Sequence, residues 1–167
     1  SRARDLLEYS YGQKKINLPE NNPGIFISQI LLGQLFRAIG EERQAINKTR
    51  EGINNYLKSP NPDPIWLGDG YYTLALINEA RKDEGLAEYY YNLADSSYAL
   101  GLGGVYDEIY LEFRRNKASF LAESGKYKTA LKLSDENYNY IVSNEGKESF
   151  NAFYQLLNFS QIEYLGK

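Results

Sequence analysis

The sequence predicts an all-α protein of about eight helices, arranged as stacked antiparallel helix pairs. Apolar residues recur at helical rather than alternating spacing along most of the 167 residues. The five prolines are confined to the segments between these helical patterns. Small residues also recur at a nearly constant distance, which is typical of a repeat protein. No run of alternating residues bounded by hairpin signals is found, so no strand is expected.

The expected helices follow one another with short polar breaks. Their ranges are 1–12, 24–40, 41–57, 69–82, 85–100, 106–124, 126–142 and 148–165. From residue 24 onward, successive helices are expected to form pairs, which we call couplets. Residues 59–70 hold the only tryptophan and are interpreted as a long loop. We expect Trp66 to fix this loop on the second couplet, and a docking or catalytic loop is the alternative.

Small residues at matched positions predict that the two helices of each couplet nest closely. Gly33, Ala75 and Ala118 recur in the first helices and Ala45, Ala87 and Ala130 in the second helices, each set spaced by 42 and 43 residues. Two antiparallel helices joined by a short turn approach closely only where neither carries a bulky side chain. Gly40 and Gly125 supply the backbone freedom that such a turn requires. A third set, Gly52 and Ala94 with Asn137 as the exception, is expected to admit the next hairpin.

These residues resemble the tetratricopeptide repeat (TPR). The first copy of its pattern is Leu32, Gly33, Phe36, Gly40 and Ala45; the second is Tyr71, Leu74, Ala75, Ala87, Tyr91 and Ala94; the third is Ala118, Gly125, Tyr127 and Ala130. Lys82 replaces the turn glycine of the second copy, where 83–85 are expected to make the turn. The third copy departs at Arg114, where an aromatic residue is usual, and at Lys117, where leucine is usual.

The resemblance implies a TPR-like α-solenoid, a right-handed superhelix of stacked helix pairs. The long repeat is similar to the variant found in bacterial sensor kinases and peptide-responsive regulators. The resemblance covers residues 1–167, which are expected to form a single domain. Complete repeats are expected at 24–58, 66–100 and 105–143. Residues 1–15 are expected to be the second helix of a preceding repeat, and 147–167 the first helix of a following one. We therefore expect the chain to be a fragment of a longer protein.

In such stacks the first helices line a concave groove, which implies a set of binding residues. They are Ile30, Gln34, Arg37, Asp69, Tyr72, Leu76, Glu79, Glu112, Arg115 and Ser119, to which the last helix would add Phe153, Leu156 and Ser160. This mixed apolar, amide and charged surface suits a peptide or protein segment. The lysine and asparagine of the family's chaperone-tail clamp are missing, so that ligand is not expected. The tyrosine-rich stretch 88–92 is either a recognition surface or, as we favour, filling between helices.

Composition excludes several other classes of function. The formal charge is −3 without a basic stripe, which argues against nucleic-acid binding. Histidine and cysteine are absent, which removes the commonest general base and thiolate chemistry. No phosphate loop, nucleophile elbow or metal-ligand spacing occurs. We expect no enzyme activity, cofactor, metal or membrane segment in this region. Carboxylate pairs for glycoside hydrolysis, Asp63 with Asp69 or Glu79 with Glu112, are the weakest alternative.

The expected function is a non-catalytic protein- or peptide-binding repeat module that serves protein–protein interaction. We expect it to be the interaction or signal-input part of a bacterial signalling or transcriptional regulator. A structural assembly scaffold is the alternative. Residues 152–159 are strongly apolar, so self-association through the C-terminal helix is also expected. The compartment is left open, with the cytoplasm favoured and the periplasm possible if the region belongs to a membrane sensor.

Overall fold

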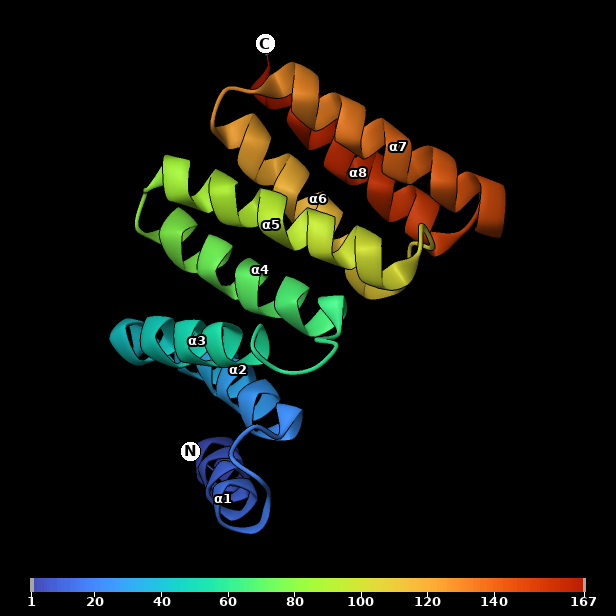
Figure 1. Ribbon diagram of the computed structural model, residues 1–167. Helices are drawn as coiled ribbons and strands as arrows, with labels where there is room; N and C mark the ends of the chain where they lie inside the picture. Colours follow the sequence, from blue (N-terminus) through green and yellow to red (C-terminus); the bar gives the residue numbers. More distant parts are fainter. Residues whose placement is uncertain (1, 167) are drawn as a thin grey trace. The chain divides into compact units, whose positions relative to one another are not determined.

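The computed structural model describes residues 2–166, and within this range the chain forms eight α-helices and no strand (Figure 1). Ser1 and Lys167, the ends of the first and last predicted segments, lie outside the described residues. The predicted all-α class with about eight helices is confirmed. The chain divides into two compact units, of which the first ends at Gly103 and the second begins at Gly104.

The first unit consists of a helix packed on two helical hairpins. Its helices are α1 (Arg2–Asn17), α2 (Pro23–Ala38), α3 (Glu42–Tyr56), α4 (Pro64–Ala80) and α5 (Glu84–Leu102). Helices α2 and α3 form one hairpin and α4 and α5 the next, while α1 packs on α2. Helix α4 contacts both α2 and α3, so the hairpins share a core that includes Leu32, Phe36, Ile53 and Leu74.

The second unit consists of three helices. They are α6 (Glu108–Glu123), α7 (Tyr127–Glu145) and α8 (Phe150–Leu165). Helices α6 and α7 form a hairpin, and α8 packs against both of them. Leu111, Ile141 and Ala152, one from each helix, form the buried centre. Because α8 contacts α6 as well as α7, the side chains on these two helices can form a common surface.

Helix α4 begins earlier than the sequence pattern predicted. Asp63 caps the helix by accepting a hydrogen bond at 2.9 Å from the backbone N–H of Ile65, and Pro64 occupies the first turn. Both are strong helix-start signals, because the cap satisfies a free N–H and proline has none to satisfy. The expectation that 59–70 form a long loop is therefore wrong. Trp66 lies on α4, where it packs partly buried against the core of the first unit.

The same tight turn joins the two helices of all three hairpins. Gly40, Lys82 and Gly125 each adopt a left-handed backbone conformation, with φ of 79°, 61° and 76°. In each turn the next residue donates its backbone N–H to a carbonyl five residues earlier, as from Asp83 to Asn78 at 2.9 Å. Lys82 takes the place and the conformation of the turn glycine, but the expectation that 83–85 make the turn is wrong, because α5 begins at Glu84.

We expect the substitution Lys82→Gly to raise the free energy of unfolding by about 0.5 kcal/mol. A left-handed conformation costs a residue with a Cβ roughly 1–2 kcal/mol, which glycine avoids, although glycine gives up part of this through the entropy of its unfolded chain. The opposite kind of substitution at the equivalent turn position, Gly125→Ala, should lower the free energy of unfolding by about 1 kcal/mol. Urea denaturation of both variants measures the two changes. A stability loss for Lys82→Gly would contradict the assignment of this turn.

Close approach within the hairpins depends on glycine, as predicted, but the contacting residues are specific. A Cβ added to Gly33 would overlap Thr49 Oγ1 and lie 3.0 Å from the Thr49 backbone nitrogen. Gly33 therefore nests on α3 one turn beyond Ala45. A Cβ on Gly52 would lie 2.9 Å from Ile30 Cγ1 on α2. The expectation that Gly52 admits the next hairpin is wrong, because it serves the close approach within its own hairpin.

Candidate ligand-binding site

The predicted groove residues of α2 lie in different environments. Ile30 is 0% exposed and packs against Gly52, so it belongs to the core and not to a surface. The prediction of Ile30 as a binding residue is wrong. Helix α2 is contacted by α1, α3 and α4, so its apolar residues mark several packed faces rather than one. Gln34 is partly buried and Arg37 is exposed.

The predicted groove residues of α4 form one row, but their carboxylates have partners inside the first unit. Tyr98 on α5 donates its hydroxyl to Asp69 Oδ1 at 2.5 Å, and Tyr91 donates to Glu79 Oε2 at 2.6 Å. Tyr72 lies between these pairs with its ring centroid 6.0 Å from that of Tyr91. Leu76 belongs to the same row and is partly buried. The two carboxylates thus satisfy buried tyrosines.

The predicted groove residues of α6 converge on one pocket of the second unit. This pocket has a volume of about 250 Å³ and lies between α6 and α8. Its lining residues are Glu112, Arg115, Asn116 and Ser119 from α6 and Tyr154, Leu157, Asn158 and Gln161 from α8. We refer to it as the Arg115 pocket. Apolar, amide, hydroxyl and charged groups all reach it, which is the mixture that binding pockets use to fix a ligand's orientation.

Arg115 is the unusual residue of this pocket. It is 8% exposed, and its Nε and Nη1 atoms are buried without a hydrogen-bond partner. The guanidinium lies over the Tyr154 ring, with 4.8 Å between its central carbon and the ring centroid. Burial lowers the pKa of Arg115 from its ordinary value, and the attraction of Tyr154, Glu112 and Glu108 opposes this only in part. The pocket therefore holds a desolvated cation with unused donors.

A buried polar network fixes the floor of the Arg115 pocket. Asn158 on α8 donates to Ser119 Oγ at 3.0 Å and accepts from Ser134 Oγ on α7 at 3.3 Å. Gln155 donates to the same Ser134 hydroxyl at 2.8 Å. These bonds connect all three helices of the second unit, and networks of this kind hold buried side chains in defined orientations. The pocket is thus organised before any ligand arrives.

The neighbouring Arg114 shows what a satisfied buried arginine looks like in this unit. Its Nε donates to Asn137 Oδ1 and its Nη2 to Glu136 Oε2, both at 2.6 Å. Its guanidinium also lies 4.7 Å from the Tyr106 ring centroid. Burial alone would lower the pKa of Arg114, but the interactions with Tyr110, Tyr106 and Glu136 outweigh it, and the pKa is raised. Arg115 has no such set of partners.

Three of the α8 side chains that line the Arg115 pocket each follow a predicted residue by one position. Phe153, Leu156 and Ser160 were expected, whereas Tyr154, Leu157 and Gln161 line the Arg115 pocket. Ser160 lines an adjoining hollow together with Ser119. The buried face of α8 carries Gln155 and Asn158, and its exposed face is rich in apolar residues, so hydrophobicity gives the wrong phase. Gln155, Asn158 and Ile162 are spaced by three and four residues, and this helical spacing is the sequence feature that marks the buried face of α8.

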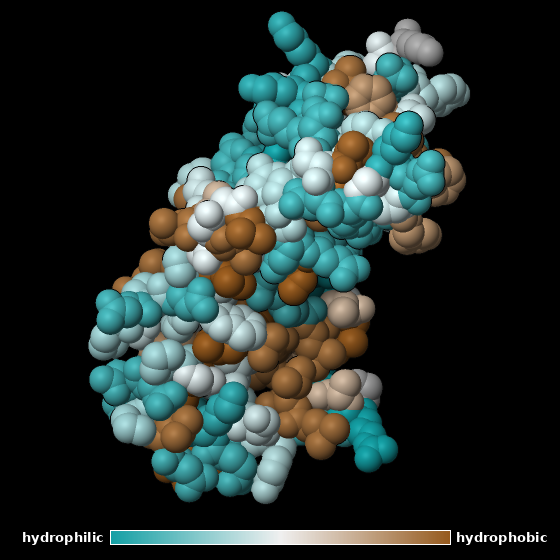
Figure 2. Space-filling view, turned by 90° about the vertical axis from the view of Figure 1, so that its right-hand side faces the viewer, coloured by the Kyte–Doolittle hydropathy of each residue, from teal (hydrophilic) through white to brown (hydrophobic). Residues whose placement is uncertain are grey.

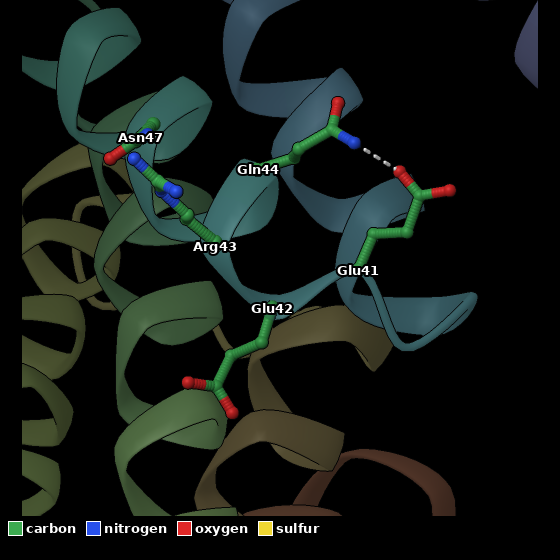
Figure 3. A pocket seen from close by; sticks show the side chains of 5 residues that line it. All are labelled: Glu41, Glu42, Arg43, Gln44 and Asn47. Atoms are coloured by element: carbon green, nitrogen blue, oxygen red, sulfur yellow. Dashed lines mark hydrogen bonds between the residues drawn. The ribbon is translucent and has the colours of Figure 1, made fainter.

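Two hollows of the first unit are weaker candidates. One lies at the start of α3, where Figure 3 shows Gln44 turned toward Glu41 and Glu42 pointing away from both. The Glu41 carboxylate already accepts from Gln44 at 2.5 Å and from Arg4 at 2.7 Å, and Glu42 lies 3.6 Å from Arg81. This polar hollow therefore holds paired side chains.

The other hollow lies between α3, α4 and α5 and is aromatic. Tyr71 stacks on Tyr90 with 6.5 Å between centroids, and Tyr89 meets Tyr90 edge-on at 5.3 Å. Burial is the main cause that raises the pKa of the Tyr71 phenol from its ordinary value. These contacts support the expectation that tyrosines fill space between helices.

Hydrophobic side chains also gather in the lower half of the face shown in Figure 2.

Residues 2–166 hold neither a metal-binding cluster nor a membrane-spanning helix. No group of three or more acidic, histidine or cysteine side chains that could hold a metal ion occurs among these residues. Within the same range, no helix has the length and apolar character needed to cross a membrane.

The paired helices and the turn repeated at residues 40, 82 and 125 define a TPR-like repeat fold. The chain matches two crystal structures of a proposed kinesin light chain from Podosopora anserina with nearly identical TPR-like repeats, each with a TM-score of 0.80 and 14% identity over 98% of this chain and 77% of that chain. It also matches BtubC from P. vanneervenii, with a TM-score of 0.73 and 18% identity over 98% of this chain and 62% of BtubC.

No protein-family model and no curated protein matches the sequence. Because the structural matches have only 14% and 18% sequence identity, they support the fold and not a function. The TPR-like solenoid class that the sequence predicted is confirmed.

Proposed function

We propose that this chain is a non-catalytic module that binds a protein or peptide segment, and that the Arg115 pocket is part of its binding surface. The observation that carries the proposal is the buried guanidinium with two unpartnered nitrogens in a pocket between two helices. Leaving buried donors unsatisfied costs free energy, and a ligand that brings hydrogen-bond acceptors would remove this cost. The structurally similar TPR-like repeat proteins support an interaction role by analogy of fold.

The groups considered for catalysis support this choice. Asp63 caps α4, and Asp69 accepts a hydrogen bond from Tyr98, so both carboxylates have structural roles. Glu79 is likewise bonded to Tyr91. Glu112 lines the Arg115 pocket as an exposed side chain without a second acid among the lining residues. A binding role requires none of these groups to exchange protons.

We further propose that the module serves as an interaction or signal-input part of a bacterial regulator. The support is the 42–43-residue spacing of the turn residues, which resembles the long repeats of such regulators. Self-association is a second candidate, because α8 exposes Phe153, Leu156 and Tyr164 at its surface. Sedimentation velocity at rising protein concentration tests self-association. A sedimentation coefficient that stays at the monomer value would rule it out.

Selection from a random peptide library displayed on phage tests the binding function. We expect the chain to enrich peptides that shift the backbone amide NMR signals of pocket residues on α6 and α8, such as Asn116 and Gln161. Residues of the aromatic hollow, such as Tyr89, serve as the internal control and should not shift. If no peptide is enriched, or if the shifts map onto the aromatic hollow instead, the proposed site is wrong.

A further inference from the structure

We propose that the Arg115 pocket binds a carboxylate group of its peptide ligand, with the Arg115 guanidinium as the recognising cation. This inference rests on the proposed binding function and adds the chemistry of the ligand. It starts from the contrast between two adjacent arginines of α6. Arg114 uses its donors on Asn137 and Glu136, whereas Nε and Nη1 of Arg115 are buried without partners.

A group that complements Arg115 must bring oxygen acceptors and preferably negative charge. Guanidinium hydrogen bonds to carboxylates are charge-assisted and stronger than bonds to neutral acceptors. The surroundings make this difference large, because Arg115 is nine-tenths buried and screening by water is weak there. The Tyr154 ring attracts the guanidinium that lies over it but supplies no carbonyl or carboxylate acceptor for its N–H groups.

The charges around Arg115 set the limits of this selectivity. Glu112 lines the pocket and Glu108 lies on the same helix, and both attract the arginine. Both are exposed, so their repulsion of an incoming carboxylate is screened by water. Two amide side chains, Asn116 and Gln161, reach the pocket from opposite helices and line the space that the peptide part of the ligand would enter.

The size and lining of the pocket indicate how much of the ligand enters. A volume of about 250 Å³ is small compared with typical ligand pockets of roughly 300–1,000 Å³. It therefore accommodates about one residue of a peptide. Leu157 provides an apolar wall beside Arg115, and it is half exposed, so a ligand that covers it buries apolar surface. A residue with a carboxylate and an adjoining apolar group fits this arrangement.

NMR titration of the arginine Nε–H signals of the whole chain tests the proposal. The probes are N-acetylleucine, which has a terminal carboxylate, its neutral amide N-acetylleucinamide, and N-acetylaspartic acid α-amide, whose only carboxylate is on the side chain. We expect at least one carboxylate probe to shift the Arg115 Nε–H signal and to bind about tenfold more tightly than N-acetylleucinamide. The tighter of the two carboxylates identifies a chain terminus or an acidic side chain as the source.

The variant Arg115→Met should abolish this preference, while the control Arg2→Met, at an exposed arginine of α1, should leave it unchanged. Because methionine retains the apolar stem and removes the buried charge, the melting temperature of Arg115→Met should not fall. The proposal is overturned if neither carboxylate shifts the signal at about 50 mM, well above the millimolar affinity expected for so small a ligand. It is also overturned if the amide binds as tightly. Peptides that still map onto α6 and α8 in that case would leave the binding function itself intact.

Discussion

Replacing Gly33 by alanine is expected to lower the free energy of unfolding by about 2 kcal/mol. The added Cβ would overlap Thr49 Oγ1 and approach the Thr49 backbone nitrogen to 3.0 Å, so α2 and α3 must move apart. Overpacking a well-packed contact costs roughly 1–3 kcal/mol, which exceeds the gain of up to about 1 kcal/mol from replacing a helical glycine. Urea denaturation monitored by circular dichroism measures the change.

Gly12 provides the matched control for this prediction. It also lies inside a helix, α1, but an added Cβ meets nothing within 4 Å. Gly12→Ala should therefore raise the free energy of unfolding by about 0.5–1 kcal/mol. The double variant Gly33→Ala with Thr49→Ala should recover part of the loss, because it removes the overlapping hydroxyl. Equal gains for Gly12→Ala and Gly33→Ala would show that the helices do not nest at Gly33.

Replacing Arg114 by alanine is expected to lower the free energy of unfolding by about 3 kcal/mol. The substitution removes the donor to Asn137 Oδ1, which is fully buried, and the partner of Glu136. It also removes the cation that lies over the Tyr106 ring. Breaking a buried charge-assisted contact costs roughly 3–5 kcal/mol when both groups are buried, and Glu136 is half exposed, so the lower end applies.

Two further variants test whether this loss comes from the Asn137 side chain, which is left without its donor. Asn137→Ala added to Arg114→Ala should recover about 1 kcal/mol, because no buried acceptor is left without a donor. Alanine also fits the position, since Ala94 occupies the equivalent place in α5. Lys132→Ala serves as the control, because Lys132 also faces Glu136, at 3.9 Å, but its side chain is 79% exposed. Its effect should stay below about 0.5 kcal/mol. Additive losses for Arg114 and Asn137 would contradict the proposed coupling.

The features of the fold that were predictable are those set by local chemistry and by repetition. The helical period located all eight helices, and the repeated small residues located the hairpins. Helix starts were less predictable, since Asp63 and Pro64 extend α4 into a stretch that looks like a loop because of its prolines. The repeat position marked Lys82 as the replacement for the turn glycine, but the turn itself was expected at 83–85, because a lysine in the left-handed conformation has no local sequence signal.

The site was predictable on one of its two helices. Glu112, Arg115 and Ser119 share one face of α6, and the repeat register placed them together correctly. Ile30 was misplaced because α2 is packed on several faces, so register alone does not distinguish groove from core. Helix α8 was misphased because its buried residues Gln155 and Asn158 are polar. Only the network with Ser134 explains why these side chains face inward.

If the Arg115 pocket is part of the binding surface, two adjacent leucines of α8 should differ in their contribution to peptide affinity. Leu156 and Leu157 are 44% and 47% exposed, but only Leu157 lines the pocket. Isothermal titration calorimetry with a selected peptide should give at least about fivefold weaker binding for Leu157→Ala, the loss expected for a contact worth about 1 kcal/mol. Leu156→Ala should bind as the unaltered chain does. Unchanged affinity for Leu157→Ala, or a loss confined to Leu156→Ala, would contradict the assignment of this pocket.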